Sequence, residues 1–335
     1  MIRLLHKIRP DFFTMALLAT VALATLLPLR GQAAHGFALA TQCAVAMLFF
    51  MHGVNLPSEA LLRGLAHWRL HSLVLVSTYL LFPALGLLAQ LLPPSILSPS
   101  LATGFLYLCC LPSTVQSSIA FTSIARGNVP AAICGASLSN LLGVFVTPLM
   151  VGLLLSAKGS VSLEQIEGIV LQILVPFGIG QALHGRLGEW AKRHKATLHL
   201  FDRGSILMVV YGAFSEAVVR GLWRQIPAES LAVMAVLDIA LLAAVLWATA
   251  RAGRLVHFHV EDRITLVFCG SKKSLVAGVP MANILFPAAL VGPILLPVML
   301  FHQIQLMACA FLARRYAARP EQDGAVDPVL VSEAA

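Results

Sequence analysis

Charged side chains are scarce in this sequence. They make up 11% of its 335 residues, whereas 59% of the residues are hydrophobic. A soluble domain usually has about a quarter of its residues charged, so the deficit excludes an ordinary water-exposed protein. Long apolar runs also recur from one end of the chain to the other. Together these features predict a polytopic membrane protein.

The sequence also lacks the spacings that indicate a metal centre, a disulfide framework or an enzyme. Its six cysteines lie in apolar runs without CxxC or Cys/His ligand spacing, and we interpret them as packing residues. None of HExxH, GxSxG and GxxxxGK[ST] occurs, and GSKKS lacks the loop spacing of a phosphate cradle. We therefore expect neither an enzyme nor a cofactor or metal centre.

Ten stretches are long and apolar enough to cross a bilayer, which takes about 20 residues. They lie at roughly 11–29, 36–56, 71–92, 100–124, 128–155, 165–184, 204–222, 229–251, 261–286 and 288–313. The first stretch follows basic residues, as a secretory signal would, but the nine later spans favour a retained helix. The expected fold class is an all-α polytopic membrane protein with ten transmembrane helices.

The distribution of basic residues predicts which side each loop faces. With successive loops on alternate sides, seventeen of the 23 lysines and arginines fall on one side and four on the other. Such an excess marks the cytoplasmic side. We therefore expect a protein of the cell (inner) membrane with both termini in the cytoplasm. The formal net charge of +8 then reflects topology and not a nucleic-acid partner.

The fourth and ninth spans are each interrupted near the middle. The ninth breaks at residues 270–274 and again at Gly278 and Pro280. The fourth breaks at Pro112, where five hydroxyl or amide side chains gather: Ser113, Thr114, Gln116, Ser117 and Ser118. A broken helix frees backbone groups that protein, water or an ion must satisfy. Two matched breaks are typical of inverted-repeat transporters, with the binding site where the broken helices cross.

The two breaks are five spans apart, so the second half of the chain would cross the membrane in the opposite sense. We expect a first five-helix repeat over residues 1–160, an inverted repeat over 161–316 and a disordered cytoplasmic tail over 317–335. This repeat rests on the order of elements, not on residue identity. The basic stretch 184–203 is expected to lie on the headgroup surface, with a polar regulatory loop as the alternative.

The pattern resembles the bile acid:sodium symporter family, in particular a divergent, sodium-site-lacking bacterial branch. CCLPSTVQSSIAFTSIARGNVP and CGSKKSLVAGVPMA carry the resemblance, which covers about residues 10–315. It implies a core of spans 3–5 and 8–10, with spans 4 and 9 crossing, that moves against a panel of spans 1, 2, 6 and 7. Alternating access to the crossing would carry an organic anion.

The resemblance also implies where sodium ligands would lie, and these positions fit poorly. Ser117 and Ser118 stand where sodium-coupled members have a Ser-Asn pair, with one extra residue in the loop. On the fifth span, Ser137, Ser139 and Asn140 are acceptable polar residues.

Three further positions depart from the family's sodium sites. Thr78, five residues before Pro83, replaces a glutamine, Phe268 replaces a glutamate, and Lys272 replaces a glutamine. Sodium prefers oxygen ligands, usually with a carboxylate nearby. Two like charges about 4 Å apart repel by roughly 4 kcal/mol at an effective dielectric constant of about 20. We therefore expect the usual sodium coupling to be absent.

Lys272 and Lys273 are adjacent in the ninth span, where a buried charge costs about 2.5–3.5 kcal/mol. Neighbours on a helix point about 100° apart, so the two cannot share one small site. We expect Lys272 in the ion position, held by Ser117, Ser118 and carbonyl groups. Lys273 would then serve an anionic substrate group or a proton-driven switch, with H⁺ in place of sodium. Alternatively, both lysines reach a cytoplasmic vestibule and only anchor the helix.

Other polar residues in the spans have two interpretations each. Asp238 is either a counter-ion for one lysine or faces the cytoplasmic side. Glu216 either faces the cleft between panel and core or pairs with Arg220 at i+4. The candidate substrate- and ion-binding residues are Thr78, Ser113, Thr114, Gln116, Ser117, Ser118, Ser137, Asn140, Asp238, Ser271, Lys272, Lys273, Ser274 and Asn283.

These features predict a secondary active transporter that moves a small organic anion by alternating access. Its expected partners are this anion, the lipid bilayer and a coupling H⁺ in preference to Na⁺. The alternative is a non-transporting membrane regulator that keeps the transporter fold.

Overall fold

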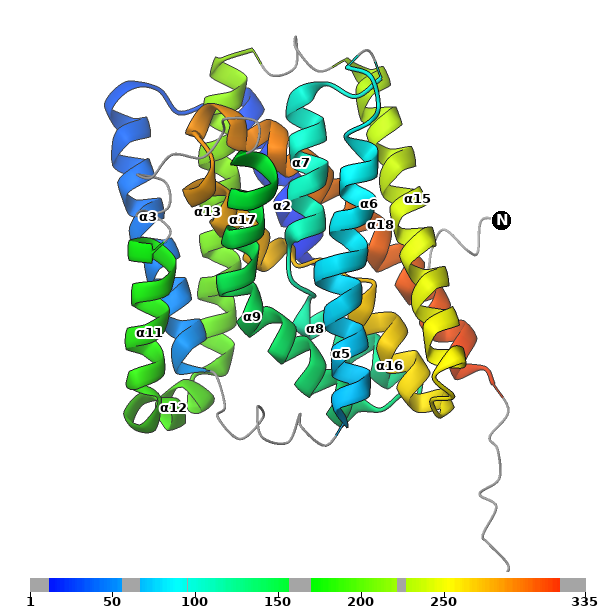
Figure 1. Cartoon of the computed structure of the whole chain (residues 1–335). Coiled ribbons are helices and arrows are strands. Elements are labelled where there is room, and N and C mark those ends of the chain that lie inside the picture. The colour runs from blue at the N-terminus through cyan, green and yellow to red at the C-terminus, as the bar shows by residue number, and fades with distance from the viewer. Residues whose placement is uncertain (1–11, 56–66, 95, 157–169, 222–226, 320–335) are drawn as a thin grey trace, which may run out of the picture.

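The computed structural model describes residues 12–55, 67–94, 96–156, 170–221 and 227–319. These residues form helices joined by short connections, with no strand among them, as expected for an all-α protein (Figure 1). The predicted boundary between repeats at residues 160 and 161 lies outside the described residues. The same holds for the first eleven residues and for the predicted tail from residue 320 onward.

The first half of the described chain runs from α2 to α9. Two helices, α5 and α6, are joined without interruption by a π-helical turn, η2. The bounds are α2 Phe12–Leu26, α3 Gly31–Val54, α5 Trp68–Val76, η2 Ser77–Leu81, α6 Phe82–Ala89, α7 Pro99–Cys110, α8 Val115–Ile124 and α9 Val129–Ser156.

The second half begins with another π-helical turn, η3, which leads into α11. The bounds are η3 Val170–Leu174, α11 Val175–Ala182, α12 His184–Arg193, α13 Lys195–Val219, α15 Ala228–Leu255, α16 Val260–Gly270, α17 Leu275–Leu285 and α18 Ala288–Ala317.

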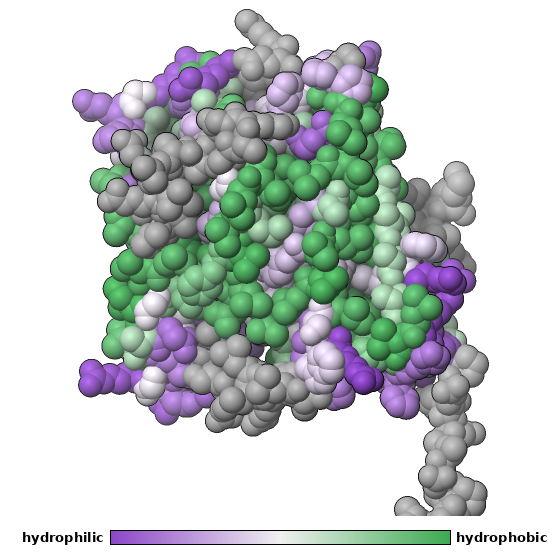
Figure 2. All heavy atoms as spheres, viewed as in Figure 1, coloured by the Kyte–Doolittle hydropathy of each residue, from purple (hydrophilic) through white to green (hydrophobic). Residues whose placement is uncertain are grey.

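Apart from α12, each described helix overlaps one of the predicted apolar stretches. Within the described ranges, five are long and apolar enough to cross a membrane: Gly31–Val54, Trp68–Ala89, Val129–Leu155, Glu229–Leu255 and Ala288–Ala317. The bent pair α7 and α8 makes a sixth if it is counted as one span. Figure 2 shows an apolar belt between two polar rims. Large apolar side chains stay exposed on the described helices, including Leu153 and Phe311 at 67% each, as expected for a surface that faces lipid.

The first predicted break separates α7 from α8 at residues 111–114. A residue before proline avoids the α conformation, and Leu111, which precedes Pro112, is extended with φ −71° and ψ 153°. Thr114 is extended as well, with φ −81° and ψ 128°, and α8 begins at the next residue. The two helices meet at a bend of 63°, so the break lies where the sequence predicts it.

The second predicted break, between α16 and α17, lies at residues 271–274. The Ser274 hydroxyl accepts a hydrogen bond of 3.1 Å from the Ala277 N–H and caps the start of α17. The further interruption predicted at Gly278 and Pro280 is wrong, because α17 continues through both residues. Gly278 instead packs closely against Leu111, since a Cβ there would lie 2.5 Å from Leu111 Cδ1.

Four helices, α2, α3, α11 and α13, pack on one another and form what we call the panel. Glycines let α3 and α11 come close. A Cβ on Gly53 would lie 2.1 Å from the carbonyl oxygen of Phe177, and one on Gly180 would lie 2.1 Å from that of Phe50. The remaining long helices, α5–α9 and α15–α18, form the core bundle, in which α7 packs on α18 and α15 on α16. In Figure 1, α3 and α11 lie to the left of α5, α6 and α15.

The basic stretch predicted to lie on the membrane surface contains a separate helix, α12, and the start of α13. α12 contacts α3, α11 and α13 and lies at the lower edge of the panel (Figure 1). Its Trp190 is 46% exposed. Lys192 donates a hydrogen bond of 2.7 Å to Glu189, and this ammonium lowers the pKa of the Glu189 carboxyl. A basic helix with an exposed tryptophan at a polar rim suits a bilayer surface.

Candidate functional site

The two helix breaks are joined to each other by hydrogen bonds. The Ser274 N–H donates to the Pro112 carbonyl oxygen at 2.8 Å. The Thr114 hydroxyl donates to the Lys273 carbonyl oxygen at 2.8 Å, and the Ser113 hydroxyl to that of Cys269 at 2.6 Å. The predicted crossing of the two broken helices is therefore a directly bonded junction.

Lys273 extends from this junction into a cage of main-chain carbonyl oxygens. Its side chain is buried, and Nζ donates hydrogen bonds to Thr78 O at 2.8 Å, Cys109 O at 2.8 Å and Leu111 O at 2.6 Å. The same atom lies 4.1 Å from the centre of the Phe82 ring. All three ammonium donors thus have an acceptor, and an aromatic face adds a cation–π contact. We call these three oxygens the carbonyl cage.

Local helix chemistry explains why the Thr78 carbonyl oxygen is available. In the π-helical turn η2 the Phe82 N–H bonds to Ser77 O, one residue further back than in an α-helix. In the same register, the donor for Thr78 O would be the N–H of residue 83, which is proline and has none. The Lys273 ammonium supplies the missing donor.

The other two oxygens of the cage belong to the end of α7, where the last carbonyls have no helical partner. Each of the four carbonyls from Leu108 to Leu111 accepts a hydrogen bond. Leu108 O accepts the Leu111 N–H, and Cys110 O accepts the Thr147 hydroxyl at 2.8 Å. Cys109 O and Leu111 O accept the Lys273 ammonium. The C-terminal end of a helix carries partial negative charge, so a cation also suits this position electrostatically.

At the end of α16, serine hydroxyl groups donate hydrogen bonds to the last carbonyl oxygens of the helix. Ser118 Oγ donates to Phe268 O at 3.2 Å and Ser77 Oγ to Gly270 O at 2.7 Å, in addition to the Ser113 bond to Cys269. Ser113 and Ser118, at and just after the first break, and Ser77 of η2 therefore donate to the last carbonyls before the second break.

Gln305 on α18 holds the main chain of Lys273 from the opposite side. Its Oε1 accepts the Lys273 N–H at 3.0 Å, and its Nε2 donates to the Lys273 carbonyl oxygen at 2.9 Å. Both main-chain groups of a residue that lies outside any helix are therefore satisfied. This clamp fixes the direction in which the Lys273 side chain leaves the backbone.

Lys272 lies in a different environment, between aromatic rings. Its side chain is buried, and Nζ lies 3.9 Å from the centre of the Phe121 ring and 5.8 Å from that of Phe268. Nζ has no hydrogen-bond partner, so the expectation that Ser117, Ser118 and carbonyl groups hold Lys272 is wrong. Lys273 is the lysine that carbonyl oxygens surround. The alternative in which both ammonium groups reach a vestibule is also wrong, because both are buried.

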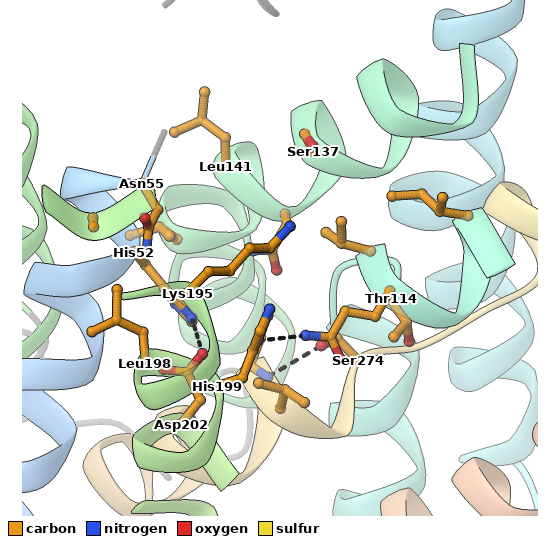
Figure 3. A pocket seen from close by; sticks show the side chains of 18 of the residues that line it. His52, Asn55, Thr114, Ser137, Leu141, Lys195, Leu198, His199, Asp202 and Ser274 are labelled. Carbon is orange, nitrogen blue, oxygen red and sulfur yellow. Dashed lines mark hydrogen bonds and ion pairs between the residues drawn. The ribbon is translucent and has the colours of Figure 1, made fainter. Parts of the chain in front are cut away.

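A pocket of about 440 Å³ lies between the panel and the core bundle, beside the junction of the two breaks. It contains Thr114, Gln116, Ser137, Asn140 and Ser274 from the predicted set, all on core elements (Figure 3). The panel contributes His52 and Asn55 of α3, Phe177 of α11, and residues of α13. Neither Lys272 nor Lys273 lines it. The structure therefore separates two features that the sequence predicts as one site: a polar pocket and a buried lysine pair.

Charged residues enter the pocket from α12 and the first turns of α13. Lys192, Lys195, His199 and Asp202 line it, and both lysines are exposed. Figure 3 shows the Lys195 side chain extending into the pocket near His52. These residues were not predicted as site residues, because their basic stretch was interpreted as a headgroup-facing surface. The only signal was its charge.

Two contacts between polar side chains shape this end of the pocket. His52 Nε2 lies 3.9 Å from Asp202 Oδ2, which joins α3 to α13 within the panel. His199 Nδ1 lies 3.0 Å from Gln116 Nε2, which joins panel helix α13 to core helix α8. Both contacts are drawn in Figure 3.

The remaining predicted residues lie apart from the pocket. The Asp238 carboxylate is buried on α15, and neither oxygen has a hydrogen-bond partner. The Ser117 hydroxyl is also unpartnered, whereas Ser271 Oγ bonds to Val267 O at 2.6 Å within α16. Asn283 is half-buried on α17 and does not line the pocket. Glu216 pairs with Arg220 at 2.8 Å, as the i+4 spacing predicts.

Comparison with known proteins identifies the family. An uncharacterized protein of Pseudomonas aeruginosa is 53% identical over 318 residues, which cover 94% of this chain and 96% of the relative. YfeH of Escherichia coli K12, whose name gives symport as a proposed activity, is 51% identical over 93% of this chain and 94% of its own length. Sodium/bile acid cotransporter 7 of Rattus norvegicus is 28% identical over 91% of this chain and 92% of its own length.

These relatives confirm the resemblance that the two broken helices carry. The model of the SBF-like CPA transporter family matches residues 11–318, nearly the whole chain. Its members are transporters and not enzymes. The chain is therefore a multi-pass membrane protein that belongs to the SBF-like CPA transporter family.

Proposed function

We propose that this chain is a secondary active transporter that carries a small organic anion by alternating access. Its substrate site would be the pocket of about 440 Å³ between the panel and the core bundle. The observation that carries this proposal is that two groups of polar side chains line this one pocket. Basic side chains of α12 and α13 face hydroxyl and amide side chains that flank both helix breaks.

The chemistry of the pocket favours an amphipathic anion. Lys192 and Lys195 supply positive charge. Thr114, Gln116 and Ser274 offer hydrogen bonds for orientation. Leu141, Val144, Phe177 and Val276 provide an apolar wall, as most small-molecule sites do. A ligand with an anionic head at the basic end of the pocket and an apolar body against this wall would match both the charge and the apolar lining.

Movement of the core bundle against the panel would expose the pocket to each side in turn. The hydrogen bond between His199 and Gln116 crosses the division between the two, so it would have to open during the cycle. The fold we propose has ten transmembrane helices in two inverted repeats, residues 1–160 and 161–316. Packing supports this: the first helix of one repeat packs on the second of the other in both directions, α2 on α13 and α11 on α3.

Sodium is not the coupling ion we propose, although a relative bears the name of a sodium/bile acid cotransporter. Ser118, in one of the family's ligand positions, donates its hydroxyl to Phe268 O. Two buried lysines also lie beside the breaks. We propose that H⁺ drives transport instead. The bias of basic residues supports a location in the cell (inner) membrane with both termini cytoplasmic.

Uptake into proteoliposomes that contain the full chain tests this proposal. A panel of small carboxylates would first be screened by thermal stabilisation of the purified protein, since a ligand stabilises the state that binds it. Uptake of the best stabiliser would then be measured with sodium, with choline in its place, and with and without a pH gradient. We expect saturable uptake that continues in choline and increases with the pH gradient. Uptake that requires sodium and does not change with the pH gradient would contradict the proposed coupling to H⁺.

A pair of charge-removing variants tests the pocket itself. Lys195→Gln should raise the KM for the anion a few-fold, because an exposed ion pair contributes up to about 1 kcal/mol. Arg251→Gln is the matched control, since Arg251 is exposed on α15 outside the pocket. Equal effects of the two variants would contradict this site. No uptake of any tested anion above that of empty liposomes would favour the non-transporting regulator.

A further inference from the structure

We propose that the Lys273 ammonium is a built-in substitute for a monovalent cation, and that the carbonyl cage around it is a latent cation site. Shortening this side chain would then open a site for a free cation such as ammonium or sodium. This site is separate from the substrate pocket and from the family positions at Ser117, Ser118, Ser137 and Asn140. It shares one family position, Thr78, but uses the main-chain oxygen of that residue and not its side chain. It does not depend on the proposed transport activity.

The geometry of the cage is that of an oxygen-coordinated cation. Three carbonyl oxygens, Thr78 O, Cys109 O and Leu111 O, lie 2.6–2.8 Å from one positively charged atom. Carbonyl oxygens are hard donors that hold hard cations in proteins, and rings of them select monovalent cations in channels. An ammonium ion takes the same place by donating one N–H to each oxygen.

The electrostatics of the cage favour a single positive charge. The three acceptors are neutral carbonyl groups. One of them, Cys109 O, belongs to the negative end of α7, and Leu111 is the extended residue that follows this helix. The Phe82 ring, 4.1 Å away, presents its electron-rich face. No carboxylate is among the hydrogen-bond acceptors of Lys273 Nζ in the described residues. A divalent ion would therefore lack the negative ligands that it requires.

The cage is fixed by contacts that do not involve the Lys273 side chain. With η2 in its π-helical register, Pro83 leaves Thr78 O without a main-chain donor, whatever residue stands at position 273. The neighbouring carbonyls of α7 are held by the Leu111 N–H and the Thr147 hydroxyl. Ser274 N–H holds Pro112 O, and Gln305 holds the main chain at Lys273. The oxygens should therefore stay together after the ammonium is removed, and they would still need a donor or a cation.

A thermal assay on the full-length protein in detergent tests this proposal without any transport measurement. The Tm of Lys273→Ala would be measured in N-methylglucamine chloride, with increasing replacement by sodium, potassium, ammonium or methylammonium chloride at constant ionic strength. We expect a lowered Tm that one or more of these small cations raise in a saturable manner, recovering most of the loss. The wild-type Tm should not depend on which cation is present.

Lys272→Ala is the matched control, because Lys272 Nζ contacts aromatic rings and no carbonyl oxygen. Its Tm should show no cation-specific rise. If Lys273→Ala is too unstable to purify in N-methylglucamine, it would be purified with ammonium chloride present throughout. Recovery of monodisperse protein only with a small cation would support the proposal. Aggregation under all conditions, or an equal cation response of both variants, would overturn it.

Discussion

The ammonium nitrogen of Lys273 lies 2.6 Å from the carbonyl oxygen of Leu111, so a residue of the second helix break caps the helix end that the first break exposes. In the opposite direction, Ser113 of the first break caps Cys269 at the end of α16. Each break thus supplies the donors that the other requires. This reciprocity lets two helices stop inside an apolar bundle without leaving their last carbonyls unpaired.

Removal of the Lys273 ammonium should destabilise the protein strongly. Lys273→Met leaves three buried carbonyl oxygens without donors, and each orphaned polar group costs about 1–3 kcal/mol. We expect a loss of about 3 kcal/mol or more in the free energy of unfolding, measured by denaturant or thermal unfolding in detergent. A change within about 0.5 kcal/mol of wild type would mean that the cage does not depend on this lysine.

The neighbouring substitution should behave differently. Lys272→Met removes an ammonium whose Nζ has no hydrogen-bond partner. It gives up a cation–π contact of about 0.5–2 kcal/mol but also relieves the cost of a buried charge. We expect the free energy of unfolding to stay within about 1 kcal/mol of wild type in the same assay. A loss as large as that of Lys273→Met would contradict the different environments of the two lysines.

Pro83 and Lys273 should be energetically coupled. Pro83→Ala provides an N–H in the π-helical turn, and this N–H can donate to Thr78 O when the ammonium is absent. The double variant Pro83→Ala/Lys273→Met should therefore be more stable than the sum of the single effects predicts, by about 1 kcal/mol. A double-mutant cycle from unfolding measurements gives this coupling. Simple additivity would show that the missing proline donor does not explain the availability of Thr78 O.

The close packing of α3 on α11 gives a prediction for the panel. Gly53→Ala places a Cβ 2.1 Å from the Phe177 carbonyl oxygen, so the helices must separate, at a cost of about 1–3 kcal/mol. Gly152→Ala is the control: it lies in α9, and its Cβ would meet nothing within 4 Å. That change should be neutral or stabilising by up to about 1 kcal/mol. Equal thermal stability of the two variants would contradict this packing.

The variant Asp238→Asn tests whether the buried Asp238 carboxylate is a counter-ion for Lys272 or Lys273. Its two oxygens have no hydrogen-bond partner, and no ion pair joins it to Lys272 or Lys273 in the described structure. Burying an unpaired carboxylate is costly, so Asp238→Asn should leave the Tm unchanged or raise it. A loss of about 3 kcal/mol or more in the free energy of unfolding is instead expected for one member of a buried ion pair. That result would restore Asp238 as a counter-ion.

The fold was largely predictable because composition and helix breakers act locally. Apolar runs of bilayer length gave helix positions close to those found, and Pro112 and Gly270 marked both breaks. Gly278 and Pro280 are helix breakers by residue type, yet α17 continues through both. The sequence does not reveal that Gly278 packs against Leu111. In the described part of the chain, five helices, or six with the bent pair, are long and apolar enough to cross a membrane, and the count of ten spans stays a prediction.

The site was predicted only in part, for a different physical reason. The serines of the first break are recognisable by type, but the carbonyl cage consists of main-chain groups at Thr78, Cys109 and Leu111, which carry no side-chain signature. The sequence also gave no indication of which lysine enters the cage. Residues 271–274 are not helical, so the 100° rule for neighbouring helical residues does not apply to them. Gln305 and the end of α7 determine the outcome instead.

The most direct test of the central claim is a high-resolution cryo-electron microscopy map of the full-length protein, recorded once in sodium and once in choline. The account predicts the same density in both maps, continuous from the Lys273 backbone to a tip between the carbonyl oxygens of Thr78, Cys109 and Leu111. An isolated peak between those oxygens in sodium, absent in choline and with the Lys273 side chain directed elsewhere, would contradict it.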